Sequence, residues 1–186
     1  KAGQTQQALQ IFDKAFSVVG SISSNSSKAW ALRNIASELA KAGQFDKALN
    51  VAWFIYDNDD KAWALYVIAS ELAKAGQFDK ALNVAGSISD NDDKAWALRD
   101  IALELAKAGQ LDKAVSVAGS ISDDSKKAWA LIDIVVELAK AGQFDKAVTV
   151  YGSISYGHYK TLALNNIAEE LAKAGQTQQA LQIFDK

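Results

Sequence analysis

The chain contains no proline, no cysteine, no methionine and a single histidine. Without cysteine it can form neither a disulfide scaffold, nor a thiolate nucleophile, nor a cysteine-based metal site. The single histidine, His158, excludes the two-histidine zinc motif of metalloproteases. The sequence shows no glycine-rich phosphate loop and no catalytic triad, so we expect no enzymatic activity, no metal and no cofactor.

The chain also lacks an excess of either charge and any long apolar run. Its 20 Lys and Arg residues and 22 Asp and Glu residues give a net charge of −2. This balance argues against nucleic-acid binding, because phosphate contacts need a surplus of cations. Nothing approaches the roughly 18 consecutive apolar residues of a membrane span, so we expect a soluble, cytoplasmic protein without a membrane partner. A first residue other than methionine suggests an excerpt, a processed chain or an engineered product.

What the sequence does contain is an internal repeat of constant period, marked by the motif KAWAL and, in its last copy, by KTLAL. The motif begins at Lys28, Lys61, Lys94, Lys127 and Lys160. We therefore predict a single repeat domain, 1–186, composed of a partial unit (1–27), four full units (28–60, 61–93, 94–126 and 127–159) and a partial terminal unit (160–186). Units of this size stack on their neighbours to bury one continuous core.

Each unit is predicted to form two helices, because apolar residues recur in it at helical spacing. In the first full unit, Gly43 is expected to end the first helix, since glycine accepts a left-handed backbone. The second helix is expected to begin near Phe45 or Asp46. Asp59 or Asp60 is expected to cap the first helix of the next unit. The whole chain is thus predicted to be an all-α solenoid of about eleven helices.

The unit resembles the tetratricopeptide repeat. The family's turn, Gly-x-aromatic-x-x-Ala, is matched by GQFDKA at residues 43–48, and Ala36 and Leu39 fit its packing positions. The chain departs from the family in its period of 33 rather than about 34 residues, in its lack of a helix-ending proline and in the early position of Trp30. The resemblance implies a right-handed superhelix of antiparallel helix pairs. It also implies a concave face that binds peptides or proteins, and no reaction.

The two ends of the chain share one sequence. Residues 1–14 and 173–186 both read KAGQTQQALQIFDK. The first partial unit also carries about seven extra residues, or two helical turns, which predicts an elongated second helix. The identical ends leave two interpretations open: an excerpt or a reused cap, or an end through which chains assemble head-to-tail.

The first two full units differ at only five of 33 positions, and all five lie at one junction. Trp53, Phe54 and Tyr56 stand where the next unit has Gly, Ser and Ser, and Tyr66 and Val67 stand where the preceding unit has Arg and Asn. We predict that these five side chains form a partner-binding patch, since exposed aromatic residues mark interfaces. The alternative, that this junction only needs extra packing, stays open.

A second and more diffuse group of exceptions lies in the last units. It comprises Ile132, Val136, Tyr151, Tyr156, His158 and Tyr159, and we predict a possible second interface there.

Together these features predict a non-enzymatic protein–protein interaction scaffold of engineered origin, which binds a protein partner or itself. One alternative is a structural repeat array that self-assembles through its identical ends. A weaker alternative is an RNA-binding helical repeat, because some repeat families read one base per unit. The near-balanced charge counts against that alternative.

Overall fold

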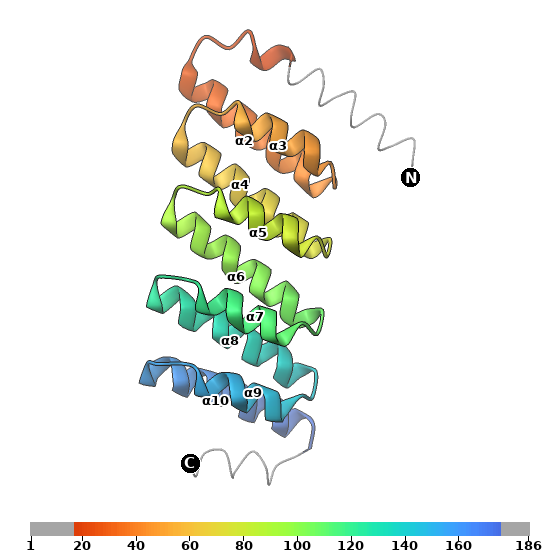
Figure 1. The fold of residues 1–186 in the computed structure, drawn as a ribbon, viewed down its shortest axis with the longest axis vertical. Helices are drawn as coiled ribbons and strands as arrows, with labels where there is room; N and C mark the ends of the chain where they lie inside the picture. The colour runs from red at the N-terminus through yellow and green to blue at the C-terminus, as the bar shows by residue number, and fades with distance from the viewer. Residues whose placement is uncertain (1–16, 176–186) are drawn as a thin grey trace. The chain divides into compact units, whose positions relative to one another are not determined.

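The computed structural model describes residues 17–175, and its helices follow the repeat (Figure 1). Long helices of 17 residues alternate with short helices of nine. The helices with defined bounds are α2 (Asn25–Lys41), α3 (Phe45–Trp53), α4 (Asn58–Lys74), α5 (Phe78–Gly86), α6 (Asn91–Lys107), α7 (Leu111–Gly119), α8 (Asp124–Lys140), α9 (Phe144–Gly152) and α10 (Gly157–Lys173). Every long helix begins at the same position of its repeat, so the sequence repeat is also the structural repeat.

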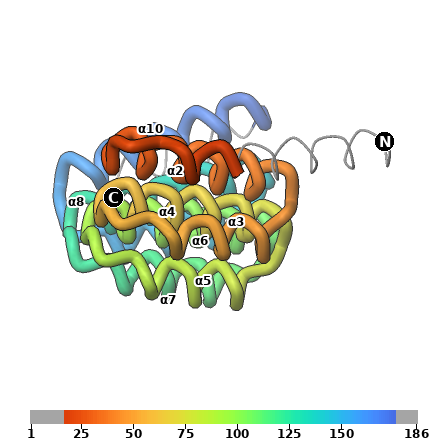
Figure 2. Tube along the Cα trace, turned by 90° about the horizontal axis from the view of Figure 1, so that it is seen from above, coloured from red at the N-terminus to blue at the C-terminus, as the bar shows by residue number. Residues whose placement is uncertain are grey.

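The chain divides into two compact units, Lys1–Ala97 and Leu98–Lys186. In the first unit α2 packs against α3 and α4, and α4 packs against α5; Figure 2 shows α2 and α4 side by side. In the second unit α8 packs against α9 and α10, and α7 packs against α8. Helix α6 runs from the first unit into the second. Both units consist of stacked antiparallel helix pairs in the described range, which confirms the predicted all-α class.

The turn within each helix pair is set by one glycine. Helix α2 ends at Lys41, and Gly43 adopts a φ of +73°. The amide of Gly43 donates to the carbonyl of Ala40 at 2.9 Å, and the amide of Gln44 donates to that of Leu39 at 2.8 Å. These bonds satisfy carbonyls that the end of the helix leaves unpaired. The predicted stop at Gly43 is confirmed, and so is the predicted start of the next helix near Phe45 or Asp46, since α3 begins at Phe45.

The cap of α4 lies earlier than the sequence indicated. The N-cap of α4 is Asp57, whose carboxylate accepts from the amides of Asp59 and Asp60 at 3.1 and 3.0 Å. The prediction of Asp59 or Asp60 as the cap is therefore wrong, because both residues are already in the first turn of α4. There they still suit the positive end of the helix dipole.

The core of each unit is built from alanine on facing helices and larger aliphatic residues between them. In the first unit Leu65, Ile68 and Leu72 of α4 are fully buried, and Ala48 of α3 has no exposed surface. An isoleucine after each short helix is also buried, at the equivalent position of successive repeats: Ile55, Ile88, Ile121 and Ile154. These isoleucines fix the inter-repeat loops to the core.

None of the helices described between residues 17 and 175 is long and apolar enough to cross a membrane. The elongated helix predicted for the partial unit 1–27 and the identical segments 1–14 and 173–186 lie largely outside the described residues. The same is true of the remaining helices among the predicted eleven.

Candidate functional site

Three large aromatic side chains are exposed around the loop that joins α3 to α4. Trp53, the last residue of α3, is 53% exposed, Phe54 is 63% exposed and Tyr56 is 71% exposed. We call these residues the exposed trio. A fully buried aromatic side chain covers roughly 150–250 Å². At this degree of exposure the trio presents an apolar surface of a few hundred Å², in the range where such patches mark interfaces.

The exposed trio is held in place by a buried residue in its middle. Ile55 lies between Phe54 and Tyr56 in the sequence and is only 1% exposed. The amide of Ile55 donates to the carbonyl of Ala52 at 3.1 Å, which continues the end of α3 by one turn. The loop backbone is thus anchored to the core, and the side chains on either side of Ile55 are directed to solvent.

Tyr66 and Val67 lie elsewhere on the first unit. Both are half-buried residues inside α4, and Tyr66 is about 12 Å along the helix axis from its first residue. The structure therefore divides the predicted patch into the exposed trio at the loop and a half-buried pair within the long helix.

Arg33 occupies the same repeat position as Tyr66, one repeat earlier, and its contacts show what this position faces. Arg33 Nη1 lies 2.9 Å from Oδ1 of Asp60, and its guanidinium carbon lies 4.7 Å from the centre of the Trp63 ring. Arginine can satisfy both partners because its planar cation stacks on aromatic faces and also pairs with carboxylates. This face of the long helix therefore joins successive repeats.

A run of carboxylates comes directly after the exposed trio in the chain. It comprises Asp57, Asp59 and Asp60, and the α3–α4 and α5–α6 loops lie at the same end of the helix pairs (Figure 1). The electrostatic coupling between the two loops is visible at Asp93, in the first turn of α6.

The pKa of Asp93 is raised above its ordinary value of 3.8. The largest cause is burial of the carboxyl, followed by the negative charges of Asp90, Asp92 and Asp59. Asp59 belongs to the preceding repeat, so neighbouring repeats contribute to one acidic edge.

The second predicted group is centred on the α9–α10 loop in the second unit. The ring of Tyr159 lies 5.7 Å from that of Trp129 and 6.3 Å from that of Tyr156, edge to face in both cases. The His158 ring lies 3.8 Å from the Tyr159 ring. The structure thus brings Tyr156, His158 and Tyr159 together, and adds Trp129 to them.

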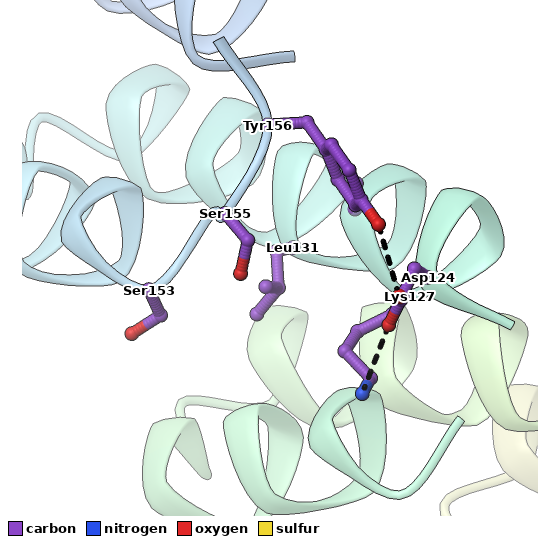
Figure 3. Close-up of a pocket in the computed structure, with 7 residues that line it drawn as sticks. Asp124, Lys127, Leu131, Ser153, Ser155 and Tyr156 are labelled. Carbon is purple, nitrogen blue, oxygen red and sulfur yellow. Dashed lines mark hydrogen bonds and ion pairs between the residues drawn. The ribbon is translucent and has the colours of Figure 1, made fainter. Parts of the chain in front are cut away.

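A small pocket lies beside this aromatic group (Figure 3). Tyr156 donates from its hydroxyl to Asp124 at 3.0 Å, and this hydrogen bond is the main reason why the pKa of Tyr156 is raised. Lys127 lies 3.7 Å from the other oxygen of Asp124. The lining is completed by Ala128, Leu131, Ser153 and Ser155. The charged groups that line this pocket, Asp124 and Lys127, are already paired with each other.

The other members of the second group do not contribute an exposed surface. Ile132 is only 3% exposed, so its prediction as an interface residue is wrong: the side chain is part of the core. Val136 and Tyr151 are half-buried, and the ammonium of Lys160 lies 5.6 Å from the centre of the Tyr151 ring.

Sequence reasoning missed the contacts that link one repeat to the next. The alignment of the repeats contained the necessary signal, since Arg33 and Asp60 both occupy positions that vary among the repeats. The two residues meet across the contact between one repeat and the next. In the same way Arg99 of α6 pairs with Asp133 of α8, because the position equivalent to Asp60 there carries Lys126.

Comparison with known proteins finds no matching protein-family model and no matching curated protein sequence. Among solved structures the chain is similar to a mutant of MamA, with 18% identity, a TM-score of 0.44, and coverage of 87% of this chain and 96% of that chain. It is also similar to Ton1535 from Thermococcus onnurineus NA1, with 19% identity, a TM-score of 0.33, and coverage of 99% of this chain and 56% of that chain. With identities below 20% and TM-scores below 0.5, these similarities assign the chain to no family.

Proposed function

We propose that the chain is a non-enzymatic scaffold for protein–protein interaction and that the exposed trio is its main docking surface. The observation that supports this proposal is that the equivalent loop of the next repeat has Gly86, Ser87 and Ser89 in place of the three aromatic residues. Folding does not need aromatic residues there, because both loops connect helices with the same bounds within their repeats. Aromatic residues that folding does not require, and that expose apolar surface, are typical of an interface.

The half-buried pair Tyr66 and Val67 within α4 is proposed as a further contact of the same partner, apart from the exposed trio. The cluster of Tyr156, His158 and Tyr159 is proposed as a separate, smaller contact region. The near-identity of the full units favours an engineered origin for the repeat.

Selection of random peptides displayed on phage tests the docking surface. Peptides retained by the parent chain are screened on a loop variant that combines Trp53→Gly, Phe54→Ser and Tyr56→Ser, which gives this loop the residues of its neighbour. A matched control is Val148→Ser on α9, which also removes an exposed apolar side chain. We expect ligands whose binding is lost in the loop variant and kept in the control.

Static light scattering over a concentration series tests whether a second copy is the partner. A dimer that disappears in the loop variant identifies self-association through the exposed trio. The proposal is overturned if the selected peptides bind the loop variant as tightly as the parent and both proteins have the same molar mass at every concentration.

A second candidate function rests on the identical sequences of residues 1–14 and 173–186. If Lys186 were followed by a copy of Ala15, the repeat would continue without interruption, so chains with matching ends can assemble head-to-tail. Deletion of residues 173–186 is expected to abolish any fibre formed in this way and to leave binding through the exposed trio intact. Electron microscopy and light scattering of the two proteins distinguish these outcomes.

A further inference from the structure

One face of α2 is less covered than the same face of the later long helices. Ala31, Ile35 and Glu38 lie on this face, since they recur at helical spacing. In α2 the alanine and the isoleucine are only half-buried. Their counterparts in α4, α6, α8 and α10 have no exposed surface: Ala64, Ala97, Ala130 and Ala163, and Ile68, Ile101, Ile134 and Ile167.

The neighbouring side chains on this face show the same difference. The side chain of Glu38 is 57% exposed, whereas its counterparts in α4, α6, α8 and α10 are between 20% and 27% exposed. Trp30 is 58% exposed, whereas Trp96 and Trp129 are 37% and 38% exposed. The cause is that α2 packs against α4, but no long helix precedes α2 within residues 17–175. We call this uncovered surface the α2 face, formed by Trp30, Ala31, Ile35 and Glu38.

The α2 face has the composition of a covered face. Trp30, Ala31 and Ile35 are the residue types that stand at the same positions of α4, where the alanine and the isoleucine are buried. Terminal repeats of soluble solenoids normally carry a polar outer face. The outward positions of α10 follow this rule, because Asn165 and Glu169 are exposed there, but the α2 face does not. Its shape and composition suit a further long helix.

The sequence indicates which long helix fits this surface. Helix α10 ends at Lys173, the first residue of the segment KAGQTQQALQIFDK at 173–186. The same 14 residues occur at 1–14, ahead of α2. The long helix that precedes this segment within the chain is α10. A copy of α10 is therefore the helix that would precede α2 in a continued array.

We propose that α10 of a second copy packs on the α2 face, in the register in which α2 packs on α4. This inference rests on the second candidate function, head-to-tail assembly, and it names the two surfaces that meet. In this register Asn165 of one copy takes the position of Arg33, and Ser27 of the other takes the position of Asp60. These two residues therefore face each other between the copies.

Asn165 and Ser27 are matched in charge. Arg33 and Asp60 form a partly buried ion pair at the equivalent contact within the first unit, 2.9 Å apart. Between the copies both charges are absent, and the amide and the hydroxyl can hydrogen-bond to each other. An arginine opposite Ser27, or an aspartate opposite Asn165, would leave a partly buried charge without a partner. The joint replacement of both charged residues therefore supports this pairing.

The polar character of α10 is compatible with this contact. The buried residues of α2 on the side of Arg33 are also small or polar: Ala29, Ser37 and Ala40. Their counterparts in α10 are exposed: Thr161, Glu169 and Ala172. Glu169 pairs with Lys173 of the same helix at 2.9 Å, so its charge has a partner before the copies meet.

Cross-linking tests the register, and the absence of cysteine from the chain makes the test specific. Two variants with one cysteine each, Ser27→Cys and Asn165→Cys, are mixed and treated with a short bis-maleimide. We expect a covalent dimer from the mixture and none from either variant alone. The double variant Arg33→Cys, Asp60→Cys is the positive control, because it places the same pair of positions at a contact within one chain. A mixture of Ser27→Cys with Val148→Cys measures random collision.

Restoring the ion pair between copies tests the same contact by a second route. Asn165→Arg and Ser27→Asp each place an unpaired charge at the contact, whereas the double variant that carries both changes restores the pairing of Arg33 with Asp60. We expect each single variant to associate about tenfold more weakly than the double variant in analytical ultracentrifugation. Circular dichroism verifies that each variant is folded.

The inference is overturned if the mixed cysteine variants give no more dimer than the Val148→Cys control, if one cysteine variant alone gives the dimer, or if the single and double charge variants associate equally. Chains that still form fibres, and lose them on deletion of residues 173–186, would then keep head-to-tail assembly and lose only this contact. Chains that stay monomeric at every concentration would overturn both. Docking at the exposed trio is independent of these results, and the loop variant detects its failure.

Discussion

At the scale of single residues, the side chain at the repeat position of Arg33 decides whether a carboxylate of the following repeat has a cationic partner. Arg33 supplies the cation for Asp60, and the side chains of this pair are only 28% and 18% exposed. At such partly buried positions, removing one partner leaves the other without compensation. The residue at the repeat position of Arg33 therefore affects stability as well as the character of the helix face.

Arg33→Ala is expected to destabilise the chain by about 1–2 kcal/mol, because it leaves Asp60 unpaired and uncovers the ring of Trp63. Urea unfolding followed by circular dichroism measures the effect. The matched control is Lys41→Ala, which breaks an ion pair with Glu38 whose side chains are more than half exposed. That change should stay within about 0.5 kcal/mol. Equal effects of the two substitutions would contradict the structural role of Arg33.

Asp93→Asn is expected to stabilise the chain at neutral pH. The raised pKa of Asp93 means that the folded state binds this proton more tightly than the unfolded state, whose pKa is close to 3.8. The ionised carboxylate therefore opposes folding, and this unfavourable contribution disappears as the pH falls through the folded pKa towards 3.8. Thermal unfolding at several pH values should show a stability difference at pH 7 that shrinks as the pH falls towards the unfolded value of 3.8.

The opposite result is expected for Asp60→Asn, which occupies the same repeat position but faces Arg33. That variant should lose stability at neutral pH. If both substitutions change stability in the same direction, the arginine is not the cause of the difference between the two sites.

These residue contacts mark the limit of what the sequence could predict. The sequence identified Trp53, Phe54 and Tyr56 as exceptions to the repeat, and the structure shows that their side chains are exposed. It could not assign Ile132, because an aliphatic residue in a helix suits a buried face as well as a surface patch. Contacts across 27 residues, such as Arg33 with Asp60, depend on how helices pack and do not follow from local spacing.

At the scale of elements, the ends of the helices follow from backbone chemistry. Helix starts and stops were predicted to within a few residues because glycine and aspartate act locally. The N-cap was misplaced by two or three residues at Asp59 or Asp60, since every carboxylate in the run from Asp57 has the chemistry of a cap. Only the extended backbone of Asp57, with φ −69° and ψ 125°, distinguishes it from its neighbours.

Two substitutions separate the effect of glycine in a turn from its effect inside a helix. Gly76 has a φ of +74°, and a Cβ added there would touch nothing within 4 Å, so Gly76→Ala tests backbone conformation alone. We expect it to cost about 1 kcal/mol. Gly86 lies in helix α5 with similar free space, and Gly86→Ala should stabilise by up to about 1 kcal/mol. Thermal unfolding of both variants checks the opposite signs.

At the scale of the whole molecule, stability should be distributed over the repeats. In such arrays each repeat adds its own contribution and that of its contact with the next. Deletion of residues 94–126 removes one complete period and joins Asp93 to Lys127 in the original register. We expect the shortened chain to fold with the same helicity per residue. Its urea m-value should be smaller by about a fifth, since m scales with the surface exposed on unfolding.

The deletion also tests the stacking of helix pairs. A shortened chain that has lost its helical signal would show that the repeats are not interchangeable. Two deletions that start in the middle of α6 are the controls. Removing residues 100–132, which matches the first deletion in length, keeps the period. Removing residues 100–129 shifts the period and should unfold the chain. Circular dichroism distinguishes these variants.

The buried isoleucine in the middle of the exposed trio has a consequence for the kinetics of recognition. Because Ile55 anchors the loop, the backbone that presents the aromatic rings is already ordered before a partner arrives. Binding then costs little backbone entropy and needs no folding step. Association should accordingly depend on diffusion and on attraction by the acidic edge, with on-rates that fall as ionic strength rises. Affinity differences among partners should lie mainly in how slowly each one leaves.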